Sequence, residues 1–150
     1  MTAKYCYDHP RPAVSVDSVL LSRDGYILLV KRKSAPFQGC WALPGGFVDI
    51  DETLADAAAR ELAEETGLTD VEMRELGAFD KPDRDPRGRT ISVAFLAVVD
   101  RRAEPVAGDD AADARWTPVD KLPPMAFDHD QIIAAARQAA AVDGAAHKAQ

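Results

Sequence analysis

Three glutamates within five residues, Glu61, Glu64 and Glu65, are the side chains of this chain best suited to chemistry. Successive residues of an α-helix are turned by about 100°, so the three carboxylates would project from one face of a short helix. Carboxylates crowded in this way repel one another unless a cation lies between them. Magnesium prefers such oxygen ligands and commonly bridges to the phosphates of a substrate. The spacing therefore predicts a magnesium site, which would also accept manganese.

Two further charged residues, Arg60 and Glu52, are placed to support this carboxylate face. We interpret them as an ion pair that positions the loop before the helix, and we assign both to the catalytic machinery together with Glu61 and Glu64. A run of charged residues is more often a solvated surface. Two or three glutamates on their own would favour that alternative.

A helix that presents these glutamates must bury another side. The spacing i, i+3, i+4 and i+7 predicts a buried stripe centred roughly 120° from the carboxylates, made of Ala55, Ala58, Ala59 and Leu62. Thr53, with Asp56 three residues later, forms a capping-box arrangement at the start. Gly67 can adopt the left-handed conformation that ends a helix. We therefore expect a helix bounded by Thr53 and Gly67.

The whole stretch from Gly46 to Leu68 resembles the Nudix box, G-x5-E-x7-R-E-U-x-E-E-x-G-U, in which U is a bulky aliphatic residue. Every fixed position is matched, and the resemblance extends to residues 39–46 before the box and 116–123 after it. It implies an α/β fold, the Nudix-type α/β/α sandwich with a mixed sheet between helices. It also implies a metal-dependent hydrolase of nucleoside diphosphates linked to another moiety, with the Gly46 carbonyl as a metal ligand beside Glu61, Glu64 and Glu65.

The group that takes the proton of the attacking water has two candidates. Glu61 is one, and a carboxylate outside the box is the other, because members of the family differ at this point. Three acids, Asp109, Asp110 and Asp113, lie in a loop before Trp116 that could reach the site. Their pattern is more typical of solvated loop charge.

Substrate contacts are predicted in the loop from Asp80 to Arg89, which contains Arg84, Arg87 and two prolines. Guanidinium groups can hold phosphate or ribose oxygens through paired hydrogen bonds. The alternative is a solvated loop whose arginines pair with its own aspartates. Pro82 and the run that follows it resemble the ADP-ribose pyrophosphatase branch of the Nudix family. We therefore expect Arg84, Arg87 and Pro82 at the substrate, with Arg32, from a strand leading toward the box, as a further phosphate contact.

This resemblance implies that ADP-ribose is cleaved to AMP and ribose 5-phosphate. Within the same reaction class, NADH and oxidised nucleoside triphosphates are the alternatives. The Ser-Gln-Pro-Trp-Pro-Phe run of NADH-cleaving relatives is absent. A second class is a non-catalytic sensor that binds ADP-ribose-like ligands and controls transcription. Such regulators generally carry a degraded box and an added DNA-binding domain, whereas one predicted helix fills the segment after Pro123, so we favour the enzyme.

The length of 150 residues and the 47% hydrophobic content predict one domain over residues 1–150. A net charge of -7 argues against nucleic-acid and membrane-surface binding, which favour basic patches, and predicts a small nucleotide substrate. Cys6 and Cys40 match no disulfide framework or metal-ligand spacing. Residues 1–10 contain no apolar signal segment, so we expect a cytoplasmic protein. Many members of the family form dimers, which leaves a homodimer open.

Strands are expected on both sides of the glutamate helix. Asp24-Gly25 predicts a hairpin between the first two, Thr90–Val99 is β-branched enough for a central strand, and the full set is 13–21, 26–31, 71–79, 90–99 and 115–119. Asp128, with Gln131 three residues later, predicts a capped final helix that runs to about Gly144. His9, His129 and His147 have no ligand spacing, and we interpret His129 as a capping or packing residue.

Overall fold

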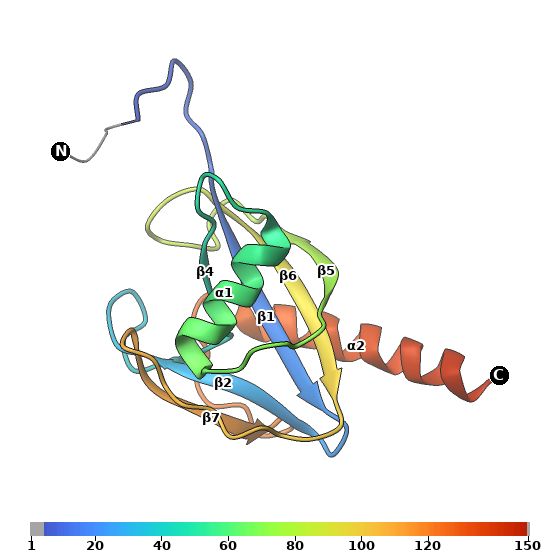
Figure 1. Ribbon diagram of the computed structural model, residues 1–150. Helices are drawn as coiled ribbons and strands as arrows, with labels where there is room; N and C mark the ends of the chain where they lie inside the picture. The colour runs from blue at the N-terminus through green and yellow to red at the C-terminus, as the bar shows by residue number, and fades with distance from the viewer. Residues whose placement is uncertain (1–4, 150) are drawn as a thin grey trace.

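The computed structural model describes residues 5–149 (Figure 1). Met1–Lys4, part of the segment predicted to carry no targeting signal, and Gln150 lie outside the described residues. In chain order the elements are β1 (Ala13–Ser22), β2 (Tyr26–Arg32), β3 (Trp41–Ala42), β4 (Gly45–Phe47), α1 (Leu54–Thr66), β5 (Arg74–Phe79), β6 (Thr90–Val99), β7 (Ala111–Pro118) and α2 (His129–Lys148). Within the described range neither helix is both long and apolar enough to cross a membrane.

The strands form one mixed sheet. Its path is β3-β2-β1-β6-β5, with β4 paired to β1 and β7 paired to β2. β1 and β6 run parallel from the pair Ala13 and Thr90 to the pair Ser22 and Val99, and the other pairings are antiparallel. β1 and β2 are partners only next to their shared turn, at Leu21 and Ile27. Beyond that point they diverge, and β4 takes the place beside the first half of β1.

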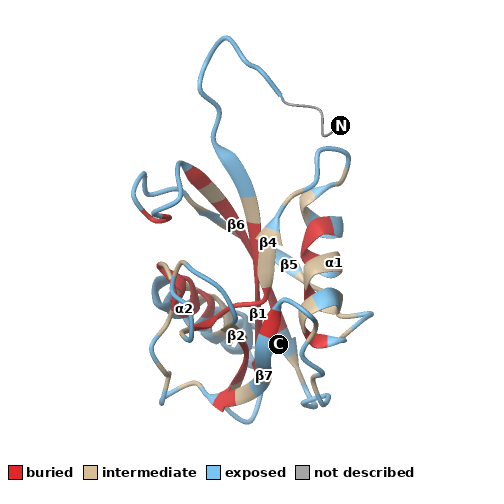
Figure 2. Ribbon diagram, turned by 90° about the vertical axis from the view of Figure 1, so that its left-hand side faces the viewer, coloured by how far each residue is buried: buried red, intermediate tan, exposed pale blue. Residues whose placement is uncertain are grey.

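The two helices cover opposite faces of this sheet (Figure 2). Alternate residues of a strand point to opposite faces, so Val16 and Leu20 of β1 pack in the clusters that hold Ala58 and Leu62 of α1. The intervening Val19 and Leu21 pack with Ile132, Ile133 and Ala136 of α2. The predicted α/β/α sandwich with a mixed sheet is confirmed.

Element boundaries agree where the signal is local. The Asp24-Gly25 hairpin is present, with Gly25 at φ +90°. β5 begins at Arg74 rather than at residue 71, and β7 begins at Ala111 rather than at residue 115. The extra residues of β7 are three alanines and one aspartate, and they are extended because their backbone pairs with the outer half of β2 through Arg32. Backbone pairing of this kind does not depend on the type of side chain, so it cannot be predicted from composition.

The helix α1 starts and ends as predicted but is turned about its axis. The Thr53 hydroxyl accepts the Asp56 N–H, and Gly67, at φ +72°, donates its N–H to the Ala63 carbonyl. The buried residues are Ala57, Ala58, Leu62 and Thr66, whereas Ala55 and Ala59 of the predicted stripe are exposed. The buried arc is rotated because Glu61 and Glu65 are themselves half-buried against β4.

The cap predicted for α2 is wrong. Asp128 stands at the N-cap position, yet its side chain makes no capping hydrogen bond, because Arg84 takes both carboxylate oxygens. The helix also continues past Gly144 to Lys148. A single glycine costs a helix only about 1 kcal/mol relative to alanine, and the alanines around Gly144 are strong helix formers.

Candidate active site

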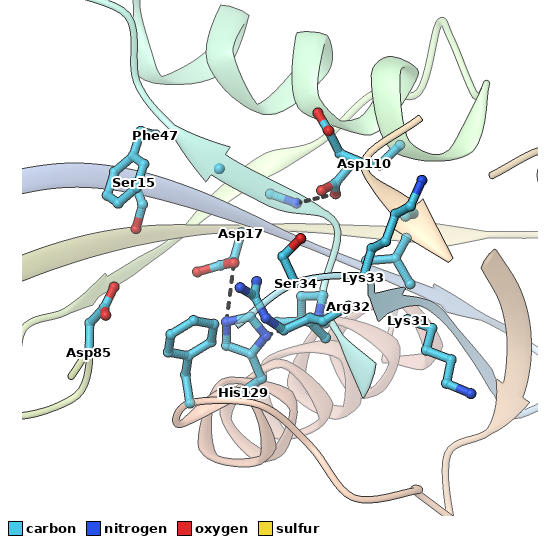
Figure 3. A pocket seen from close by; sticks show the side chains of 18 of the residues that line it. Ser15, Asp17, Lys31, Arg32, Lys33, Ser34, Phe47, Asp85, Asp110 and His129 are labelled. Carbon is cyan, nitrogen blue, oxygen red and sulfur yellow. Dashed lines mark hydrogen bonds and ion pairs between the residues drawn. The ribbon is translucent and has the colours of Figure 1, made fainter. Parts of the chain in front are cut away.

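A cleft of ≈ 350 Å³ opens where β1 and β2 diverge (Figure 3). Volumes of about 300–1,000 Å³ are typical of sites for small molecules and cofactors. Of the residues proposed from the sequence, five line the cleft: Arg32, Gly46, Glu65, Arg84 and Arg87. Glu61 lies against Gly46 but is not part of the lining, and Glu52, Arg60, Glu64 and Pro82 are outside the lining as well.

The glutamates of α1 are held against the glycines of β4. The Gly45 N–H donates to Glu65 Oε2 at 2.8 Å. A Cβ atom on Gly46 would lie 2.4 Å from Glu61 Oε1, so only glycine allows this approach. Burial raises the pKa of Glu65 to about 8 and also raises the pKa of Glu61. Two desolvated carboxylates thus lie side by side, an arrangement that a cation would stabilise.

Arg60 joins the glutamates to the loop before α1. Its guanidinium bonds both oxygens of Glu52, at 2.6 and 3.0 Å, so the predicted ion pair is present. It also donates to Glu61 at 2.9 Å, to Glu64 at 3.3 Å and to the Phe47 carbonyl. Hydrogen bonds from Arg60 lower the pKa of Glu52 to about 2. The loop and β4 are therefore tied to the carboxylate face by one side chain.

The donor set fits a hard divalent cation. Glu61, Glu65 and the backbone of Gly46 offer oxygens next to one another, and burial raises the pKa of Glu65 to about 8, so a cation beside this carboxylate would stabilise its charged form. Among residues 5–149, no three acid, histidine or cysteine side chains converge as they stand, because Arg60 engages Glu61 and Glu64. Ligation by Gly46, Glu61, Glu64 and Glu65 remains a prediction, and it requires Glu64 to turn away from Arg60.

The predicted substrate arginines are paired with aspartates. Arg84 is buried and bonds Asp128 at 2.6 and 3.0 Å. Arg87 bonds Asp85 at 2.8 Å and lies over the Phe127 ring at 5.4 Å. Arg87 shows the pairing within the loop that the sequence left as the alternative, whereas Arg84 pairs with Asp128, which lies outside the loop from Asp80 to Arg89. Both side chains still line the cleft, and each guanidinium has further N–H donors.

The third arginine, Arg32, reaches the cleft from the end of β2. Its Nε donates to the Pro36 carbonyl at 2.7 Å, and its guanidinium lies 5.0 Å from the centre of the Phe127 ring. Burial lowers the pKa of Arg32 from its very high ordinary value. Among the neighbouring aromatic residues, Trp41 is buried in the core, while Phe37 is partly exposed and packs edge-on against Phe127.

One of the three loop acids reaches the cleft. Asp110 lines it, whereas Asp109 and Asp113 are not part of the lining. The loop is docked on the end of α1, where the N–H groups of Val106 and Gly108 donate to the carbonyls of Thr66 and Glu65. A Cβ atom on Gly108 would lie 1.9 Å from the Glu64 carbonyl oxygen. The contact therefore requires glycine.

Sequence reasoning missed two residues of the cleft floor, Asp17 and His129 (Figure 3). Asp17 was the more visible, as an acid inside an apolar strand, and it is 6% exposed. His129 lies beside it, with Nε2 3.3 Å from Asp17 Oδ1. No spacing rule finds His129, because its partners are far away in sequence.

Comparison with known proteins identifies the family of this chain. The sequence matches the NUDIX domain over residues 11–136. An ADP-ribose pyrophosphatase of Methanocaldococcus jannaschii is 50% identical over 122 residues, which cover 81% of this chain and 71% of that protein. An ADPR responsive transcriptional repressor, NtrR of Acinetobacter baylyi, is 32% identical over 84% of this chain, which spans only 53% of the repressor.

A solved structure shares the fold as well. The NUDIX domain of NrtR from Shewanella oneidensis, in a cocrystal with ADP ribose, superposes with a TM-score of 0.81 at 34% identity, over 88% of this chain and 92% of that one. The family match covers most of the chain, including the glutamate helix and the cleft. The chain belongs to the Nudix family, as a Nudix pyrophosphohydrolase that resembles the ADP-ribose pyrophosphatase branch.

Proposed function

We propose that this protein hydrolyses ADP-ribose to AMP and ribose 5-phosphate with the help of Mg²⁺ or Mn²⁺. The observation that carries the proposal is the composition of the cleft, where the desolvated Glu65 and the Gly46 backbone share one cavity with Arg32, Arg84 and Arg87. A diphosphate needs its charge neutralised on several oxygens at once. The 50% identity to an ADP-ribose pyrophosphatase supports the choice of substrate.

The metal face supplies the first part of the chemistry. Gly46, Glu61, Glu64 and Glu65 would hold the ion, which neutralises phosphate charge and lowers the pKa of a water molecule. Arg60 keeps Glu61 in place and fixes Glu52. Proton transfer then requires a carboxylate within reach of the water.

Two carboxylates compete for that proton. Burial raises the pKa of Glu61, which brings this residue closer to the range in which a base works at neutral pH. The second carboxylate is Asp110, which is the one acid of the loop before Trp116 that lines the cleft. Asp110→Asn distinguishes them: if Asp110 is the base, this variant loses the rise of kcat with pH on the acidic side of the profile while metal binding persists, and an unchanged profile leaves Glu61 as the base.

The cations of the cleft supply the second part. Lys31, Arg32, Lys33 and Arg87 line it, and they give this acidic chain a local positive surface for an anionic ligand. The Arg87 guanidinium lies 4.9 Å from the centre of the Phe47 ring and 5.4 Å from the centre of the Phe127 ring. A diphosphate would lie between these cations and the glutamates.

A substrate panel tests the proposal. Release of AMP from ADP-ribose is compared with release from NADH and with pyrophosphate release from nucleoside triphosphates, with Mg²⁺ and with Mn²⁺. Glu64→Gln should abolish turnover, while Glu72→Gln, an exposed carboxylate outside the cleft, serves as the matched control. Preference for triphosphates would overturn the substrate, and unchanged turnover in Glu64→Gln would overturn the metal face.

A sensor that binds ADP-ribose without cleaving it is the second candidate. Its support is the similarity to the ADPR responsive repressor and to the NrtR domain solved with ADP ribose. Binding of ADP-ribose with no AMP release in either metal would favour this candidate. Gel-filtration mass and a DNA-binding assay address the related proposals that the protein forms a homodimer and binds no nucleic acid. We also propose a cytoplasmic location, because Cys6 and Cys40 are free thiols.

A further inference from the structure

We propose that His129 is a positioning residue for the metal face. Its imidazole holds the backbone of Leu43, and through residues 43–46 it sets the Gly45 N–H and the Gly46 carbonyl opposite Glu65 and Glu61. This role presupposes the proposed metal-dependent hydrolysis.

The imidazole of His129 is fixed on both sides. It is 4% exposed at the first position of α2. Its Nδ1 accepts the Leu43 N–H at 3.0 Å, so in the neutral ring the proton must lie on Nε2. Nε2 is 3.3 Å from Asp17 Oδ1 (Figure 3). The contact with Asp17 therefore selects the tautomer in which Nδ1 can accept from Leu43.

Asp17 is itself held in place. It lies on β1 with the parity of Val19 and Leu21, so it points to the α2 face of the sheet. Its Oδ2 accepts the Ser92 hydroxyl from β6, which leaves Oδ1 for His129. The orientation of the imidazole is thus set by the two parallel central strands.

The Leu43 N–H links His129 to the segment that forms the metal face. Neighbouring groups are bound by backbone, since the Trp41 N–H donates to Pro124 and the Pro44 carbonyl accepts from Ser18. Leu43 lies between β3 and β4 and is buried, and its N–H takes a side-chain acceptor instead. Loss of His129 would leave a buried N–H unpaired, and the segment would move to satisfy it.

Residues 43–46 are packed too tightly for one of them to move alone. The Gly45 N–H is bonded to Glu65. Cβ atoms built on Gly45 and Gly46 would lie 2.1 Å from the Val16 carbonyl oxygen and 2.4 Å from Glu61 Oε1. Any shift at Leu43 is therefore passed to the two carboxylates. Removing residues that orient metal ligands typically weakens metal binding by about 10- to 100-fold.

The test compares His129→Leu, His129→Gln and Ala136→Gly. Leucine removes the hydrogen bond from the Leu43 N–H and the contact with Asp17, while glutamine can accept from Leu43 and donate to Asp17. Ala136 is buried two turns further along α2, so its glycine variant loses stability without touching residues 43–46. Mn²⁺ binding is measured by electron paramagnetic resonance without substrate, and kcat and KM for ADP-ribose are measured separately.

We expect a roughly 10- to 100-fold higher Mn²⁺ dissociation constant and a lower kcat in His129→Leu, recovery of both in His129→Gln, and wild-type Mn²⁺ binding in Ala136→Gly. Wild-type Mn²⁺ affinity in folded His129→Leu would overturn the inference. If His129→Leu does not fold, Asp17→Asn takes its place and should lose Mn²⁺ affinity by less than the roughly 10- to 100-fold expected for His129→Leu. Wild-type Mn²⁺ affinity in Asp17→Asn would also overturn the inference. Tight Mn²⁺ binding by a wild-type protein that leaves ADP-ribose intact would instead contradict only the proposed function.

Discussion

The buried carboxyl of Glu65 predicts that the metal-free protein becomes less stable as the pH rises. Burial raises the pKa of Glu65 from 4.5 to about 8. The negative charges of Glu61 and Asp17 raise it further, while the hydrogen bond from the Gly45 N–H and the charge of Arg32 act in the opposite direction. In the unfolded chain the carboxyl keeps its ordinary pKa. Between these two values the native state holds a proton that the unfolded chain has released. The free energy of unfolding therefore falls by about 1.4 kcal/mol per pH unit in this window.

Glu65→Gln isolates this effect. Glutamine resembles the protonated carboxyl, does not titrate, and can still accept the Gly45 N–H. At pH 4 both states of the wild type are largely protonated, and the variant should match it. At pH 7, roughly 2.5 units above the unfolded pKa, the variant should be more stable by about 3 kcal/mol.

Urea unfolding in EDTA across pH 4 to 8 measures this difference. Glu64→Gln is the matched control, because the Glu64 side chain is 58% exposed and its replacement should give no gain that grows with pH. Adding Mg²⁺ should stabilise the wild type by mass action and leave Glu65→Gln unchanged. A stability difference between wild type and Glu65→Gln that stays flat from pH 4 to 8 would refute the burial of a protonated Glu65.

Three further outcomes are expected. Glu52→Gln should flatten the loss of stability as pH falls from 4.5 through 2, because hydrogen bonds from Arg60 depress the pKa of Glu52 and favour its charged form above that range; acid titration followed by circular dichroism measures it. Gly108→Ala should lower kcat by displacing the loop docked on α1, as steady-state kinetics would show. Asp128→Asn should destabilise the protein by up to about 3–5 kcal/mol, because it removes the close partner of the buried Arg84 charge and leaves only Asp17, at 3.9 Å, and chemical unfolding reports the loss.

The parts of the site that depend on neighbouring residues could be predicted from the sequence. Thr53 and Gly67 bound α1 as expected, since capping and left-handed termination involve residues within one turn. The Arg60 and Glu52 pair also follows from the box, because both belong to one short stretch. Local periodicity carries this information directly.

The parts that depend on distant residues could not be predicted. The capping rules predicted that the Asp128 side chain would cap the start of α2. The buried guanidinium of Arg84, from another loop, is instead the stronger partner for its carboxylate. Ala55 and Ala57 are chemically identical, so hydropathy alone could not decide which of them faces the sheet. The contact of His129 with Leu43 joins segments with no local relation.

The parallel pairing of β1 with β6 bears on the order in which this molecule can assemble. Asp17 and Ser92 meet only because residues 13–22 lie beside residues 90–99, and the glutamate helix lies in the chain between them. Pairings this distant form slowly, since a long loop must close before its contacts are gained. During synthesis, α1 can emerge and coil before β6 exists. The floor of the cleft would then be among the last regions to form, so catalytic competence would report completed folding of the sheet.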